Sequence, residues 1–175
     1  MLKVGEPAPG FTLSGILNKK VSNYSLAKQK GRWTVVFFYP LDFTFVCPTE
    51  IKGFDRHFAE FKKLKADVWG ISVDSIHSHR AWIESDFKSL KFPLLSDFNK
   101  EVTSLYEVDT EAEEGIVALR GTFIVDPEGM LRYAVVSDNN VGRSVEETLR
   151  VLQALQTGGL CPVEWEPGEV TLKGA

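Results

Sequence analysis

The chain has 175 residues, of which 43% are hydrophobic and 25% are charged, a composition typical of one soluble globular domain. Its 20 basic and 24 acidic residues give a net charge of −4, which argues against nucleic acid as a partner. No apolar stretch approaches the ~20 residues that span a bilayer, and the first residues lack the apolar segment of a secretory signal. We therefore expect a cytoplasmic protein without a membrane role.

Predicted strands and helices alternate along most of the chain. Short apolar runs bounded by turn residues predict strands, and apolar residues spaced three and four apart predict helices. In chain order, the prediction is an entry segment at 1–31 with a minor strand at 21–26, a buried strand at 33–39, a helix from 47, a strand at 66–73, a helix to about 90, a short strand at 92–97, a brief helix at 101–106, strands at 121–126 and 131–136, and a helix at 144–156. This order predicts an α/β sheet with an antiparallel edge.

The remaining segments carry more local signals. The acidic segment 107–115 is expected to be a loop. Ser144 and Glu147 form a capping box for the last helix, and Gly158 suits its end. The residues that follow contain prolines and Cys161, and we expect them to form a loosely held tail.

Cys47 is the first candidate for chemistry. It follows a buried strand and stands at a helix start, where unpaired N–H groups stabilise an anion, and the thiolate is the reactive form of cysteine. A buried, inert cysteine is the alternative. Cys47-Pro48-Thr49-Glu50 occupies the place of the Cys-x-x-Cys pair in thioredoxin-like oxidoreductases. Because Glu50 replaces the second thiol, any redox partner of Cys47 lies elsewhere.

The same region resembles a known family. Pro40-x-x-x-Thr44-x-x-Cys47 matches the active-site motif of the peroxiredoxins, and residues 38–50 resemble the typical two-cysteine branch, which includes the bacterial alkyl hydroperoxide reductase C subunit. Further similarities lie at residues 69–74, Ser78-His79-x-x-Trp82, Phe92-Pro93-Leu94, Arg120-Gly121-Thr122-Phe123 and Gly142-Arg143-Ser144. The resemblance implies a thioredoxin-like α/β fold in its peroxiredoxin variant, with a central mixed sheet flanked by helices. The domain would span 1–157, and a C-terminal tail at 158–175 would carry the resolving cysteine.

The resemblance also implies roles for individual residues. Cys47 would be the peroxidatic nucleophile, which becomes a sulfenic acid. Arg120 would stabilise the thiolate and bind the peroxide oxygens. Thr44 would accept a hydrogen bond from the peroxide and donate one to the sulfur, and Pro40 would shield the pocket from water.

Three more residues complete the implied site. Glu50 would hydrogen-bond Arg120 and hold it in place. Arg143 would add positive charge, although a solvated residue at a helix entry is the alternative. Cys161 would attack the sulfenic acid of a second subunit, which implies a homodimer with disulfides between subunits; rings of five dimers are common in this branch.

The function that the resemblance implies is an antioxidant, thiol-dependent peroxidase. It would reduce hydrogen peroxide and alkyl hydroperoxides and be recycled by a dithiol reductase, either thioredoxin or a dedicated flavoprotein. No cofactor is expected, because the chain lacks a glycine-rich phosphate loop. No metal is expected either, because the two cysteines are far apart and His77 and His79 lack further ligands.

Two alternatives remain. A disulfide reductase of the same fold is disfavoured by the missing Cys-x-x-Cys. A chaperone or signalling scaffold built on oligomers would survive Cys47→Ser, whereas a peroxidase would not.

Overall fold

The computed structural model describes residues 2–172, and a seven-stranded mixed sheet forms its centre. The strands are β1 (Thr12–Leu17), β2 (Lys20–Ser25), β3 (Trp33–Phe38), β4 (Ala66–Ser72), β5 (Leu94–Ser96), β8 (Arg120–Val125) and β9 (Leu131–Ser137). Their order is β2-β1-β5-β4-β3-β8-β9. The three central strands β5, β4 and β3 are parallel, and the pairs outside them are antiparallel. The mixed sheet is confirmed, but antiparallel strands border it on both sides instead of one.

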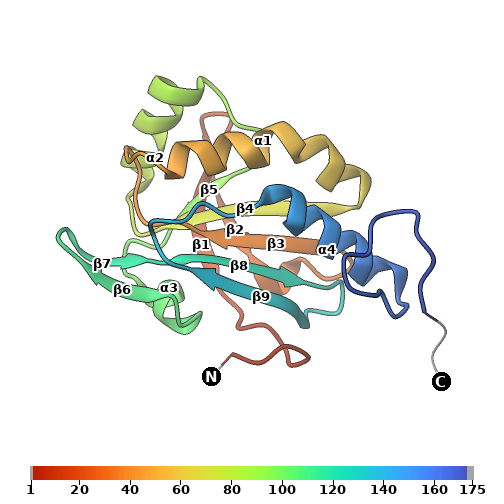
Figure 1. Ribbon diagram of the computed structural model, residues 1–175. Helices are drawn as coiled ribbons and strands as arrows, with labels where there is room; N and C mark the ends of the chain where they lie inside the picture. Colours follow the sequence, from red (N-terminus) through yellow and green to blue (C-terminus); the bar gives the residue numbers. More distant parts are fainter. Residues whose placement is uncertain (1, 173–175) are drawn as a thin grey trace.

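The helices are α1 (Cys47–Lys63), α2 (Ile76–Trp82), α3 (Glu101–Leu105) and α4 (Val145–Thr157), with a short 3-10 turn at Leu26–Lys28. Helices α1 and α4 contact each other and cover the same face of the sheet (Figure 1). The helix predicted to reach residue 90 ends earlier, because α2 passes into a π-helical turn at Ile83–Phe87 that stops at Lys88, whose φ is 65°.

Strand β3 is buried on both faces, which explains its continuous apolar sequence. Val35 and Phe37 point toward the side covered by α1 and α4, and Val36 and Phe38 point into the second core on the opposite face. Phe37 stacks on Phe54 of α1 with 4.2 Å between ring centroids. This packing fixes the strand end from which the chain enters residues 40–46, hereafter the Cys47 loop.

The acidic segment is a hairpin, so the predicted loop is wrong. Strand β6 (Asp109–Ala112) pairs with β7 (Gly115–Ala118) in a separate two-stranded ribbon that projects from the sheet (Figure 1). Gly115 follows the turn with a φ of 105°. The carboxylates stay exposed on this ribbon, so their charge does not oppose strand pairing.

The described part of the tail is anchored to α4, which corrects the expectation of a loosely held segment. Trp165 is only 3% exposed, and its carbonyl accepts a hydrogen bond from Arg150 of α4 at 2.9 Å. A backbone bridge also joins Leu160 to Leu172. Residues 173–175 of the predicted tail lie outside the described residues. No helix between residues 2 and 172 has the length and hydropathy needed to cross a bilayer.

Candidate active site

Cys47 is the first residue of α1 and has no exposed surface. Pro48 occupies the first turn, where its missing N–H costs no hydrogen bond. The predicted helix start at Cys47 is therefore confirmed. Its sulfur lies at the N-terminal end of a helix of 17 residues, where the helix dipole stabilises a negative charge.

Arg120, the first residue of β8, brings a cation to the sulfur. Its Nη1 atom lies 3.4 Å from Sγ of Cys47 and 2.5 Å from Oε2 of Glu50. Its Nε and Nη2 atoms both donate to the backbone carbonyl of Asn139, at 3.0 and 2.8 Å. The side chain is 3% exposed. The guanidinium is thus held from two sides with one edge directed at the thiol.

Glu50 joins this arginine to a second one. Its Oε1 atom accepts from the backbone N–H and the Nε of Arg143, at 2.9 and 2.8 Å. Arg143 also donates to the carbonyls of Gly121 and Phe38. Its side chain is 5% exposed, so the alternative of a solvated residue at the helix entry is wrong. Burial lowers the pKa of Arg143, and the neighbouring charge of Glu50 opposes that shift.

We call Arg120, Glu50 and Arg143 the arginine cluster, and its charges do not cancel. Two guanidinium groups face a single carboxylate, which leaves one positive charge in a buried space. Buried charges are costly unless they are paired. A thiolate at Cys47 would supply the missing negative charge, so the cluster favours the reactive form of this cysteine.

The Cys47 loop carries the two other residues of the implied motif. Pro40 is buried and follows the end of β3 by two residues. Thr44 is half-buried, and its hydroxyl donates to the carbonyl of Leu41 at 3.0 Å. The structure therefore records a bond within the loop instead of the expected donation from Thr44 to the sulfur. The oxygen of this hydroxyl can still accept a hydrogen bond.

Cys161 lies on a different part of the molecule. It is half-buried, and its sulfur is 3.5 Å from Oγ1 of Thr157 and 3.8 Å from the carbonyl of Ala154, both on α4. Both cysteines are free thiols. The structure thus brings Cys47, Arg120, Glu50 and Arg143 into contact, whereas Cys161 packs against α4.

Two features of the site were missed at the sequence level. The carbonyl of Asn139 holds Arg120, and a backbone acceptor in a loop leaves no sequence signal. His79 belongs to a segment that resembles the family, but the sequence does not predict its partner, which is Asp42 of the Cys47 loop at 2.8 Å. Within residues 2–172, no three His, Cys, Asp or Glu side chains gather closely enough to hold a metal ion.

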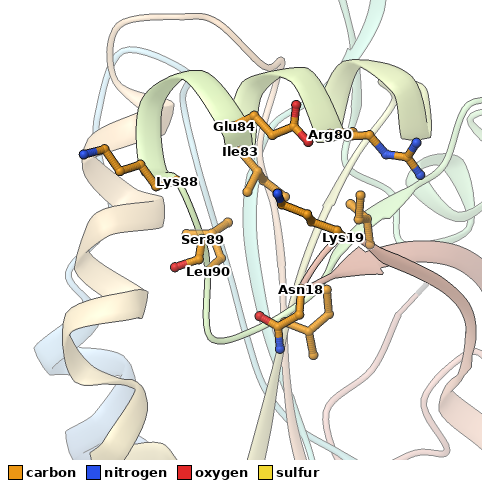
Figure 2. A pocket seen from close by; sticks show the side chains of 10 residues that line it. Asn18, Lys19, Arg80, Ile83, Glu84, Lys88, Ser89 and Leu90 are labelled. Carbon is orange, nitrogen blue, oxygen red and sulfur yellow. The ribbon is translucent and has the colours of Figure 1, made fainter.

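A separate pocket of about 230 Å³ lies between the β1–β2 turn and the π-helical turn (Figure 2). Its lining combines apolar residues such as Ile16, Ile83 and Leu90 with the charged residues Lys19, Arg80, Glu84 and Lys88. Neither cysteine lines it. The shallow hollow nearest the arginine cluster is lined by Thr49, Glu50 and Arg143.

Comparisons with known proteins agree with this geometry. Residues 4–134 match the model of the AhpC/TSA family. YkuU of Bacillus subtilis, which is provisionally named as a peroxiredoxin, is 54% identical over 177 residues, covering 97% of both chains. The chloroplastic 2-cysteine peroxiredoxin of Chattonella marina var. antiqua is 46% identical, covering 98% of this chain and 92% of the relative. The reduced 2-Cys peroxiredoxin of Plasmodium vivax superimposes with a TM-score of 0.91 at 32% identity, covering 97% of this chain and 92% of the other.

The structural match confirms the thioredoxin-like fold, and the family match extends over most of the chain. Cys47 lies at a helix start beside the guanidinium of Arg120, an electropositive setting of the kind in which reactive cysteines occur. The chain therefore belongs to the AhpC/TSA family and is a peroxiredoxin of the AhpC type, a thiol-dependent peroxidase.

Proposed function

We propose that Cys47 is the residue that reduces the peroxide, with hydrogen peroxide and alkyl hydroperoxides as substrates. Its thiolate attacks one oxygen of the O–O bond, and the other oxygen leaves with a proton as water or an alcohol. Cys47 then carries the first oxygen as a sulfenic acid. The single observation that carries this proposal is the 3.4 Å contact between Arg120 Nη1 and Cys47 Sγ, because a buried cation beside the sulfur favours the thiolate.

The neighbouring residues have distinct roles in this scheme. Arg120 and the Thr44 hydroxyl bind the peroxide, and Arg120 stabilises the charge that develops on the leaving oxygen. Pro40, the buried first residue of the Cys47 loop, keeps water out. Glu50 and Arg143 are positioning residues, because Glu50 holds the guanidinium of Arg120 and Arg143 in turn holds Glu50. No cofactor takes part in this cycle.

We further propose that Cys161 of a second subunit resolves the sulfenic acid. Its thiol displaces the hydroxyl, which leaves as water, and a disulfide to Cys47 forms. The protein would act as a homodimer, alone or in rings of dimers, in which residues 1–157 form the peroxidase domain and 158–175 present Cys161. An external dithiol protein, either thioredoxin or a flavoprotein reductase, would return both cysteines to thiols.

This scheme is tested with one equivalent of hydrogen peroxide on wild type, Cys47→Ser and Cys161→Ser, followed by non-reducing gels and intact-mass analysis. We expect a covalent dimer in wild type only and a trapped sulfenic acid at Cys47 in the Cys161 variant. A folded protein whose Cys47 does not react would contradict the assignment of Cys47. A disulfide within one chain would keep the peroxidase chemistry and contradict resolution between subunits.

A further inference from the structure

A second buried charged group lies at the other end of the Cys47 loop. His79 of α2 and Asp42 of the loop have side chains that are 0% and 1% exposed. The Nδ1 atom of His79 is 2.8 Å from Oδ2 of Asp42, and its Nε2 atom is 3.1 Å from the carbonyl oxygen of Leu95. The carbonyl oxygen of Leu95 and an ionised Asp42 can accept hydrogen bonds but cannot donate them. Each ring nitrogen of His79 must therefore carry a proton to make its hydrogen bond. The geometry therefore fits an imidazolium paired with a carboxylate.

The groups around this pair support the same protonation states. The hydroxyls of Tyr39 at the end of β3 and Ser78 of α2 donate to Asp42, each at 2.9 Å. Burial, reinforced by the charge of Asp42, raises the pKa of Tyr39 well above its usual value and keeps it a donor. The Tyr39 oxygen also lies 3.5 Å from Nδ1 of His79.

Asp74 adds a second carboxylate to this group. Its Oδ2 atom accepts from the backbone N–H of Asp42 at 2.9 Å and from the hydroxyl of Ser72. Burial and the nearby charge of Asp42 raise the pKa of Asp74, and His79 opposes that rise. Among the described residues, His79 is the only basic side chain recorded in hydrogen-bond contact with either carboxylate.

The two buried charged groups enclose a short segment. Asp42 is fixed by α2, and Glu50 is fixed by the arginine cluster. Between them lie residues 43–49, which include Cys47 and the almost fully exposed Phe45, at 95%. A fully buried sulfur cannot meet a second cysteine unless this segment moves, because a disulfide needs Cβ atoms about 3.8 Å apart.

We propose that Asp42 and His79 are positioning residues that clamp the start of the Cys47 loop and so set how often Cys47 leaves its pocket. This inference rests on the proposed role of Cys47. The clamp decides between two fates of the sulfenic acid. In an open loop it condenses with a thiol to give a disulfide and water, and in a closed loop it reacts with a second peroxide to give a sulfinic acid and water or an alcohol.

The test compares His79→Asn and Asp42→Asn with His77→Gln. His77 is an exposed histidine of the same helix, and its side chain makes no hydrogen bond to any residue between 2 and 172. Hydrogen exchange of the reduced full chain, followed by mass spectrometry, reports opening without relying on peroxidase activity. We expect peptides covering 43–49 to exchange about tenfold faster in both clamp variants, because each loses a charged hydrogen bond. Peptides of α4 and the His77→Gln protein should exchange like wild type.

Three further measurements sharpen this test. The double variant should open the loop no more than either single variant, because both changes break the same contact. ¹⁵N spectra of histidine-labelled protein report the protonation of each imidazole ring. The wild-type resonances of His79 are identified by their absence from the spectrum of His79→Asn, and they should show both ring nitrogens protonated at neutral pH. At a fixed excess of hydrogen peroxide, the fraction of sulfinic Cys47 should fall about threefold in the clamp variants.

Unchanged exchange at 43–49, or an equal increase over the whole chain, would overturn the clamp. A neutral His79 ring would overturn the ion pair. If His79→Asn does not fold, Ser78→Ala removes one bond to Asp42 and is expected to give about threefold faster local exchange. If Cys47 proves inert to peroxide, the proposed function fails, while the exchange data still decide whether the clamp exists.

Discussion

The Nη1 atom of Arg120 lies 3.4 Å from the sulfur of Cys47, so the first residue of β8 contacts the first residue of α1. The two residues are 73 positions apart in the chain. The antiparallel pairing of β8 with β3, in which Thr122 lies opposite Phe37, sets where Arg120 begins its strand. The electrostatic environment of the thiol is therefore a product of strand register.

Arg120→Lys tests how much of the chemistry depends on the shape of the guanidinium. A lysine keeps the charge but cannot hold Asn139, Glu50 and the sulfur at once. We expect the rate of Cys47 oxidation by hydrogen peroxide to fall about 100- to 1000-fold, measured by stopped flow. Arg56→Lys, at an exposed position of α1, is the matched control and should react like wild type. Equal rates in the two variants would contradict a specific role for Arg120.

Glu50→Gln tests the balance of charge in the arginine cluster. Without the carboxylate, two buried guanidinium groups face each other uncompensated, and removing one partner of a buried ion pair costs about 3–5 kcal/mol. Urea denaturation should show a loss of that size. Glu60→Gln, on the exposed side of the same helix, should change stability by less than about 1 kcal/mol. A loss in Glu50→Gln no larger than in this control would argue against the cluster as described.

The hydroxyl of Thr44 is tested by two substitutions, each of which changes one group of the threonine side chain. Thr44→Ser keeps the donor to Leu41 and the acceptor for the peroxide, whereas Thr44→Val keeps the shape and loses both. We expect Thr44→Ser to keep most of the peroxidase rate and Thr44→Val to lose about tenfold or more. Rates are compared at saturating reductant, so that the peroxide step is limiting. Full activity in Thr44→Val would remove Thr44 from the site.

The ionisation of Asp126 is expected to make the free energy of unfolding depend on pH. Burial alone would raise its pKa, but N–H groups of Met130 and Glu128 and the guanidinium of Arg132 together lower it. A lowered pKa favours the ionised carboxylate in the folded state. Its contribution to stability is therefore present above about pH 4 and is lost as the pH falls through the lowered value.

Asp126→Asn should thus unfold with a free energy about 1–2 kcal/mol below wild type at pH 7. This difference in the free energy of unfolding between variant and wild type should become smaller as the pH falls, as measured by denaturation from pH 7 to pH 2. Glu128→Gln, an exposed carboxylate in the same turn, is the control and should follow wild type throughout. A difference in unfolding free energy that stays constant with pH would show that the charge of Asp126 does not contribute to stability.

The sequence predicted the elements that position the site because their signals are local. The apolar run of β3, the apolar spacing of α1 and the proline after Cys47 each act within a few residues. The family resemblance then named Arg120, Glu50 and Arg143, which the structure brings together beside Cys47. The acidic hairpin was missed although its pairing is local, because the sequence Asp-Thr-Glu-Ala of β6 lacks the alternating apolar residues that predict a strand and has the polar side chains of a solvated loop. The link between Asp42 and His79 was missed because 37 residues separate them and only packing shows that both are buried.

The anchoring of the tail by Trp165 bears on the speed at which Cys161 finds a partner. The segment between the end of α4 and Trp165 is an arc fixed at both ends. A thiol on such an arc samples a small volume, so its effective concentration at any site within reach is higher than on a free chain end, and outside that reach it falls to nearly zero. In the proposed resolution step, little further ordering entropy is therefore lost when the anchored tail presents Cys161, and the geometry of the tail limits which sulfur Cys161 can reach.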